Sequence, residues 1–127
     1  MTDAASKSEL RVLVVDDDVD SREVTAAFLR ASGFSVLEYE AAEPALLNAS
    51  AVDAVVTDIT LPGMNGYELA RELRAMRPAI RLIALTGYGQ NADRAAAAAA
   101  GFDAHCTKPV TTSALLDQIE GRQPARG

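Results

Sequence analysis

The chain has 127 residues, of which 49% are hydrophobic and 24% charged, with a formal net charge of −6 and one cysteine. This composition predicts one globular domain with its own core and not a disordered chain, and the single cysteine excludes an internal disulfide. The negative charge disfavours a direct nucleic-acid surface, which would need clustered basic residues. Because no basic and apolar leader opens the chain and no apolar run reaches membrane-spanning length, we expect a cytoplasmic protein without membrane contact.

The start of the chain, residues 1–9, is polar and is expected to be disordered, and the first strand is predicted at residues 10–15. Residues 20–23 have the spacing of a helix capping box and predict a helix with an apolar face. The positions expected on that face are Val24, Ala27, Phe28 and Ala31. Gly33 is expected to end the helix.

The next predicted elements are a strand at residues 34–38, a short helix at 44–48 and a third strand at 52–57. The third strand is a β-branched run that cannot continue through Pro62 and Gly63. Asp58 is therefore expected at or just past the carboxyl end of this strand.

The second half of the chain repeats the alternation of strands and helices. A capping-box spacing at residues 65–68 predicts a third helix. Its inward-facing residues are expected to be Leu69, Leu73 and Met76. Residues 80–85 predict a fourth strand, and the alanines at 95–100, after a cap at Asn91, predict a fourth helix. The chain ends with a short fifth strand, a last helix and a flexible tail, at residues 104–107, 112–120 and 121–127.

Five strands that alternate with five helices are typical of an α/β fold, in which helices cover both faces of a parallel sheet. The chain has no internal repeat and no linker, so we expect residues 10–120 to form the domain. In an open sheet of this kind, ligands and chemistry gather beyond the carboxyl ends of the strands.

Polar residues follow four of the five predicted strands at that edge. Asp16 and Asp17 follow the first strand, Asp58 the third, Thr86 the fourth and Lys108 the fifth. Five polar residues at one edge would be an improbable coincidence, and their agreement predicts a functional site there.

The three carboxylates need a cation. At an effective dielectric of 20, a close pair of like charges repels by about 4 kcal/mol. Lys108 is one candidate cation, and an oxygen-preferring divalent ion such as Mg²⁺ is the other. A carboxylate nucleophile next to Mg²⁺ and a lysine, with the Thr86 hydroxyl nearby, predicts phosphoryl transfer onto Asp58.

This pattern resembles the receiver domain of response regulators, the phosphoacceptor module of two-component signalling. The resemblance extends over about residues 10–120 and depends on the paired acids, the Asp-x-x-x-Pro-Gly run at 58–63, Thr86, and the Lys-Pro pair at 108–109. It implies a flavodoxin-like (βα)5 fold, a three-layer sandwich with the strand order 2-1-3-4-5. It also implies a phosphorylation-dependent switch and not a turnover enzyme.

The resemblance implies that Asp58 accepts a phosphoryl group from a phosphohistidine of a histidine kinase or a histidine phosphotransfer protein. Asp17, Asp58 and the main-chain carbonyl of Thr60 would bind Mg²⁺ directly, and Asp16 would act mainly through water. Self-dephosphorylation would be slow.

In the same family, Thr86 would swing toward the phosphoryl group and Lys108 would pair with it. The bond between Lys108 and Pro109 is usually cis in this family. The change would reach a downstream protein through the face formed by the fourth helix, the fifth strand and the fifth helix.

Two features of the chain bear on how the switch works. Receiver domains commonly have Tyr or Phe three residues before the lysine, as the ring that turns inward, whereas this chain has His105. Thr60 and Tyr88 occupy positions that tune how water reaches the acyl phosphate, and a bulky Tyr88 predicts a longer-lived phosphoryl group.

His105 and Cys106 are neighbours on a strand and should face opposite ways, with Cys106 in the core.

Three other functions remain open from the sequence. One is a docking module that works without phosphorylation. Another is a phosphohydrolase with Asp16 as nucleophile and Asp18 as acid and base, although Asp20 stands where such enzymes need Thr or Val. The third is a flavodoxin-like electron carrier, which would need a hydroxyl-rich phosphate loop after the first strand.

Overall fold

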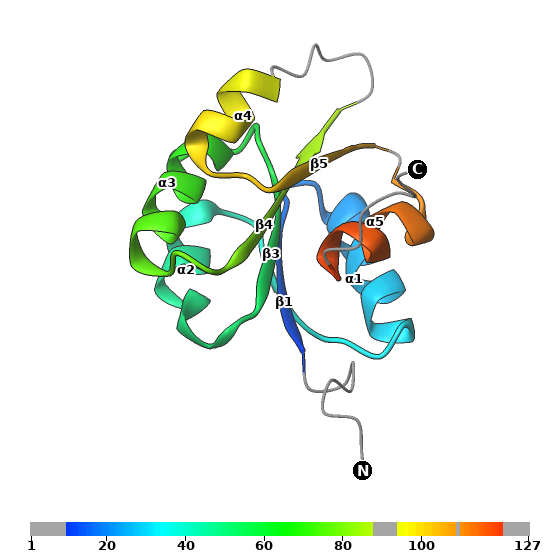
Figure 1. The fold of residues 1–127 in the computed structure, drawn as a ribbon. Helices are drawn as coiled ribbons and strands as arrows, with labels where there is room; N and C mark the ends of the chain where they lie inside the picture. Colours follow the sequence, from blue (N-terminus) through cyan, green and yellow to red (C-terminus); the bar gives the residue numbers. More distant parts are fainter. Residues whose placement is uncertain (1–9, 88–93, 109, 121–127) are drawn as a thin grey trace, which may run out of the picture.

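The computed structural model describes residues 10–87, 94–108 and 110–120, which form a five-stranded parallel sheet with helices on both faces (Figure 1). The strands are β1 (Arg11–Val15), β2 (Ser35–Tyr39), β3 (Ala54–Asp58), β4 (Arg81–Thr86) and β5 (Ala104–Thr107). The helices are α1 (Val19–Ala31), α2 (Ala42–Leu47), α3 (Gly66–Met76), α4 (Arg94–Ala100) and α5 (Thr112–Ile119), with a short 3₁₀ helix, η2 (Ala49–Ala51). The strand order is β2-β1-β3-β4-β5, which confirms the predicted fold.

The core has two apolar layers, one on each face of the sheet. Because side chains alternate along a strand, Leu13 and Val55 pack toward α2, α3 and α4, whereas Val14 and Val56 pack toward α1 and α5. Figure 1 shows the same division, with α1 and α5 on one side of the sheet and the other three helices opposite. The central strands are apolar on both faces, as expected for a parallel sheet that is covered twice.

Helix α1 begins two residues earlier than predicted. Its first residue is Val19, and its N-cap is Asp18, whose side chain makes no capping hydrogen bond. The capping box expected at residues 20–23 is therefore wrong, and Asp20 lies inside the first turn. Gly33 follows the helix with a φ of 102°, so its predicted role as the end of the helix is confirmed.

The buried face of α1 also differs from the prediction. Thr25, Ala26 and Leu29 are buried, whereas Val24 is 51% exposed. Of the other residues expected on the buried face, Ala27 and Ala31 are exposed and Phe28 is half-buried. Two polar residues of the first turns, Ser21 and Arg22, bond to Asp16 and hold the helix in this rotation.

Helix α3 begins with the predicted capping box, in which Asn65 and Glu68 each accept a hydrogen bond from the other's main-chain N–H at 2.9 Å. Leu69 and Leu73 are buried as predicted. Met76 is half exposed, so its predicted inward position is wrong. Met76 lies at the margin of the buried arc, and Ala70 fills the inward position on the other side.

The last two helices follow the predicted pattern within the described residues. Helix α4 ends at Ala100, and Gly101 follows it with a φ of 109°. Helix α5 is capped by Thr111, whose hydroxyl accepts from Ala114 N–H at 3.2 Å. The expected cap at Asn91 and the expected disorder of both chain ends lie outside the described residues. Across the described ranges, no helix is both long and apolar enough to cross a membrane.

Candidate functional site

Asp16 follows β1 directly and is fully buried, with 0% of its surface exposed. Its Oδ1 accepts from the N–H of Asp18 at 3.0 Å, and its Oδ2 accepts from the Ser21 hydroxyl at 2.8 Å. The ammonium group of Lys108 donates to the same Oδ2 at 2.8 Å. The main-chain carbonyl of Asp16 accepts from the Arg22 guanidinium at 2.9 Å. Both carboxylate oxygens are thus hydrogen-bonded, as a buried charge requires.

Asp58 is the last residue of β3, and its side chain is 13% exposed. Its Oδ2 lies 3.1 Å from Nζ of Lys108, and its Oδ1 accepts from the main-chain N–H of Thr60 at 3.2 Å. Lys108 therefore bridges Asp16 and Asp58 with one ammonium group. This bridge is the first part of the predicted arrangement that the structure brings together.

The surroundings shift the pKa values of the bridged groups. Burial raises the pKa of Asp58, and the nearby Asp16 charge acts in the same direction, while Lys108 opposes both. Burial alone would lower the pKa of Lys108, but its hydrogen bonds to the two carboxylates outweigh burial and raise that pKa. Lys108 is therefore a cation throughout the neutral pH range, whereas burial disfavours the charged form of Asp58.

The residues at this edge fit a divalent cation. Asp16, Asp17 and Asp58 each offer one carboxylate oxygen, and these oxygens lie within 4.8 Å of one another. Carboxylates are the hard oxygen ligands that Mg²⁺ prefers. Asp17 is exposed, whereas both oxygens of Asp16 already accept hydrogen bonds from the protein. Direct ligation is thus easier for Asp17 than for Asp16.

Thr86 is the last residue of β4 and is buried, with its hydroxyl directed toward β5. The hydroxyl lies 3.4 Å from Oγ1 of Thr107 and 3.5 Å from the carbonyl oxygen of Cys106. Contacts of this length are weak, so they oppose rotation of the side chain only slightly. The main-chain carbonyl of Thr86 accepts from the N–H of Lys108 at 2.7 Å, which joins the ends of β4 and β5.

His105 and Cys106 lie on β5 and face opposite sides of the sheet, as predicted. Cys106 packs in the core layer of α1 and α5, and burial raises the pKa of its thiol, so its interpretation as a core residue is confirmed. His105 is half-buried beside Ala84 of β4. Tyr88 lies outside the described residues, as does Pro109 with the expected cis bond.

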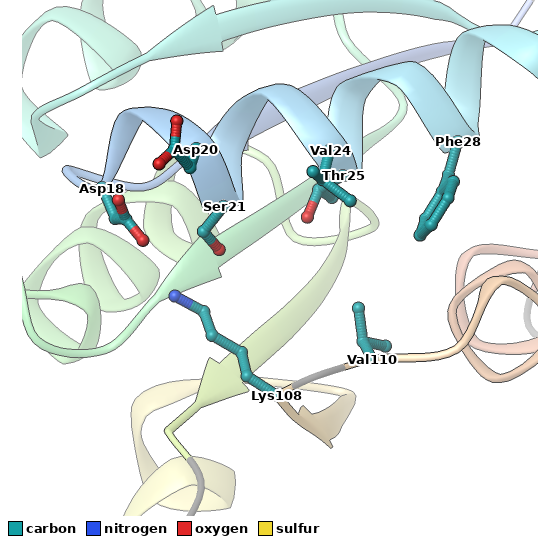
Figure 2. A pocket seen from close by; sticks show the side chains of 8 residues that line it. All are labelled: Asp18, Asp20, Ser21, Val24, Thr25, Phe28, Lys108 and Val110. Atoms are coloured by element: carbon teal, nitrogen blue, oxygen red, sulfur yellow. The ribbon is translucent and has the colours of Figure 1, made fainter.

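The structure adds residues that sequence reasoning missed. Ser21 and Arg22 hold Asp16 from the first turns of α1. Ser21 and Arg22 come five and six residues after Asp16. This spacing would predict their contacts with Asp16 only if the rotation of α1 were already known. A second missed feature is a groove of about 520 Å³ beside Lys108. Figure 2 shows the side chains that line it. Its apolar walls are Val24, Phe28 and Val110.

Comparison with known proteins points to the same family that the sequence pattern resembles. The family model for the response regulator receiver domain matches residues 12–120. A cyclic di-GMP phosphodiesterase of Thermotoga maritima is 34% identical over 110 residues, which are 87% of this chain and 30% of that protein. The transcriptional regulatory protein GlrR of Escherichia coli is 32% identical over 117 residues, 91% of this chain and 26% of that protein. The chain thus spans less than a third of either relative.

The fold of this chain also matches a solved structure. The CheY-like response regulator receiver domain protein of Methanospirillum hungatei has a TM-score of 0.80 and 32% sequence identity, with 88% of this chain and 91% of that chain covered. The matched residues include every strand end at which the polar residues described above collect. The chain belongs to the response regulator receiver domain family.

Proposed function

We propose that this receiver domain, a phosphoacceptor module of two-component signalling, accepts its phosphoryl group on Asp58. The observation that carries the proposal is the bridge from Lys108 to Asp58 and to the buried Asp16, at 3.1 Å and 2.8 Å. Phosphoryl transfer needs positive charge placed in advance where the phosphoryl oxygens will lie. Lys108 holds that charge beside the carboxylate that ends β3.

In the proposed reaction, an Asp58 carboxylate oxygen forms the new P–O bond while the P–N bond of a phosphohistidine breaks and the imidazole leaves with the bonding electrons. Asp17, Asp58 and the main-chain carbonyl of Thr60 would hold Mg²⁺, with Asp16 acting through water. When bound there, Mg²⁺ supplies further positive charge to the phosphoryl oxygens. Lys108 pairs with one of these oxygens.

The proposed switch begins at Thr86. Its hydroxyl leaves the weak contacts with β5 and turns to a phosphoryl oxygen, and His105 follows toward the vacated space. The change then reaches a downstream protein through the face of α4, β5 and α5. We also predict that the phosphoryl group on Asp58 is long-lived, because a bulky Tyr88 would shield it from water.

We further propose that the groove beside Lys108 receives the protein that carries the phosphohistidine. The groove is continuous with the phosphoacceptor site, since Lys108 belongs to both, and its apolar walls come from α1 and from Val110 (Figure 2). A histidine kinase or histidine phosphotransfer protein with apolar side chains around its histidine would fit it.

Residues 10–120 are proposed as the domain, a switch that works in the cytoplasm and does not turn over a substrate.

The experiment that tests the phosphoacceptor is intact-mass analysis after incubation with acetyl phosphate, with and without Mg²⁺. The wild-type chain should gain one phosphoryl group that depends on Mg²⁺, and Asp58→Asn should gain none. Asp20→Asn, an exposed acid on the first turn of α1, is the matched control and should react like the wild type.

Two outcomes would contradict the proposal: no adduct on the wild type, or an adduct that persists in Asp58→Asn. No adduct would favour the docking module that works without phosphorylation. Steady release of phosphate from a phosphomonoester would favour the phosphohydrolase.

A further inference from the structure

The hydroxyl group of Ser21 makes a contact in the site that the proposed reaction does not use. It donates to Oδ2 of Asp16 at 2.8 Å, and the ammonium group of Lys108 donates to the same oxygen at 2.8 Å. Figure 2 shows the Ser21 hydroxyl and the Lys108 ammonium group directed into the same space from α1 and from the end of β5. Two donors from distant parts of the chain thus meet on one oxygen of a buried carboxylate.

Lys108 cannot serve Asp16 and a phosphoryl group equally well. Its ammonium group is already shared with Asp58 at 3.1 Å. A phosphoryl group on Asp58 brings more negative charge than the carboxylate had, and it draws the ammonium group away from Asp16. Asp16 then loses its only charged side-chain donor among the contacts described here, while it stays buried.

A buried carboxylate that loses a donor is destabilised unless other donors stay in place. The donors that stay are the main-chain N–H of Asp18 on Oδ1 and the Ser21 hydroxyl on Oδ2. Of these two, only Ser21 bonds to the oxygen that Lys108 leaves. Its place in the first turns of α1 fixes the hydroxyl independently of Lys108.

We propose that Ser21 is a positioning residue, which keeps Asp16 hydrogen-bonded while Lys108 moves to the phosphoryl group on Asp58. This inference rests on the proposed function. The Ser21 hydroxyl contributes more when Lys108 has left Asp16 than before, so it favours phosphorylation and has little effect on Mg²⁺ held by the other acids. Because a hydrogen bond to a charged group contributes most when no other donor replaces it, we expect its loss to slow phosphorylation about tenfold.

The test compares Ser21→Ala and Ser21→Thr with the wild-type chain. Phosphorylation by acetyl phosphate at saturating Mg²⁺ is followed by intact mass, and the dissociation constant for Mg²⁺ is measured separately by calorimetry. Ser21→Ala should be phosphorylated about tenfold more slowly with a nearly unchanged Mg²⁺ constant, and Ser21→Thr should restore the rate because it keeps the hydroxyl.

Ser32→Ala is the matched control, since Ser32 ends the same helix and its hydroxyl donates to the carbonyl of Phe28 at 3.0 Å, far along α1 from the site. A second readout needs neither metal nor donor. In NMR spectra of the metal-free chain, Ser21→Ala should shift the carboxyl ¹³C signal of Asp16 and the amide proton of Asp18, and Ser32→Ala should shift neither.

Three results would overturn the proposal: a wild-type rate in Ser21→Ala, an equally slow Ser21→Thr, or unchanged Asp16 and Asp18 signals. Failure of the proposed function looks different. In that case the wild type takes up no phosphoryl group, or Asp58→Asn takes one up, and this proposal falls with it whatever the rates of the Ser21 variants.

Discussion

Nζ of Lys108 lies 3.1 Å from Oδ2 of Asp58, although the two residues are 50 positions apart and lie at the ends of strands that are not neighbours. Strand β4 lies between β3 and β5, so the lysine spans about two strand spacings, roughly 10 Å, to reach the carboxylate. Its long aliphatic stem makes this reach possible. The sheet topology therefore delivers a cation to a carboxylate that burial would otherwise leave poorly solvated.

Replacing Lys108 with methionine should destabilise the fold and strengthen Mg²⁺ binding. Methionine fills a similar volume without charge, which leaves the buried Asp16 with no ammonium partner, and we expect a loss of about 2 kcal/mol in the free energy of unfolding. The remaining acids then repel one another more strongly, so a divalent cation gains affinity. Urea denaturation with and without MgCl₂ measures both effects.

The loss of stability in Lys108→Met should shrink when Mg²⁺ is saturating, because the metal then supplies the missing charge. Arg71→Met, at an exposed position on α3, is the control and should change stability by less than about 0.5 kcal/mol. An equal loss with and without Mg²⁺ would show that the lysine and the metal do not act on the same acids.

The stability of the chain should respond to pH through Asp58. Burial raises the pKa of Asp58 in the folded state above the unfolded value of 3.8. Between the two pKa values the folded state binds more protons, so this group lowers stability as pH rises through that window. Asp58→Asn removes the titration, and it should therefore be more stable than the wild type at neutral pH.

Thermal unfolding of Asp58→Asn and the wild type between pH 3 and pH 7, without Mg²⁺, measures this difference. For a domain of this size, each 1 kcal/mol should raise Tm by about 4 °C. The two curves should converge toward pH 3, where Asp58 is protonated in both the folded and the unfolded state. Asp20→Asn should show no such gain, and a less stable Asp58→Asn at pH 7 would mean that Lys108 outweighs burial.

Gly66, the first residue of α3, and Gly63, in the loop before that helix, should respond differently to alanine. A Cβ atom at Gly66 would lie 2.5 Å from the carbonyl oxygen of Asp58 and 2.7 Å from Cα of Ile59, which are backbone atoms, so the main chain itself must shift to make room. Gly66→Ala should therefore displace Asp58, lower stability by about 3 kcal/mol and slow phosphorylation by acetyl phosphate.

Gly63 has a φ of 74°, and the nearest atom to a Cβ there is a flexible Glu43 carboxylate oxygen at 3.4 Å. Gly63→Ala should lower the free energy of unfolding by about 1 kcal/mol through backbone strain alone, with phosphorylation unchanged. Urea denaturation and intact-mass kinetics on both variants separate the two effects. Equal phosphorylation rates in the two variants would mean that the position of Asp58 tolerates the displacement.

Local sequence signals predicted much of the site, because each of its principal residues comes directly after an apolar run. Asp16 follows β1, Asp58 ends β3 and Thr86 ends β4, so the strand boundaries alone place them at one edge. The capping box of α3 was equally predictable, since Asn65 and Glu68 interact within one turn.

The rotation of α1 could not be predicted in the same way. Its sequence has apolar or small residues on more than one side, so the stripe through Val24 and Phe28 competes with the one through Ala26 and Leu29. The outcome depends on contacts with other parts of the chain, such as the hydrogen bond from Arg22 to the carbonyl of Asp16. The contact of Ser21 depends on the same rotation, so the sequence pattern could not reveal it.

The rotation of α1 leaves Val24 and Phe28 on the groove beside Lys108, and it suggests a test of the proposed docking site. Val24→Ser removes an apolar wall at a position that is 51% exposed, so it should leave folding intact. If a phosphohistidine partner buries this side chain, transfer from that partner should slow about tenfold, whereas phosphorylation by acetyl phosphate should not change.

The partner for this test is first found by screening purified, autophosphorylated histidine kinases and phosphotransfer proteins for rapid transfer to the wild-type chain. Leu47→Ser is the matched control, because Leu47 is 83% exposed on α2, across the sheet from α1. It should leave both reactions unchanged. Equal slowing by both variants would indicate a general effect of lost apolar surface, and no slowing by Val24→Ser would place the docking partner on another face. Slow reaction of Val24→Ser with acetyl phosphate as well would mean that the substitution disturbs the site itself, through the first turns of α1 that hold Asp16.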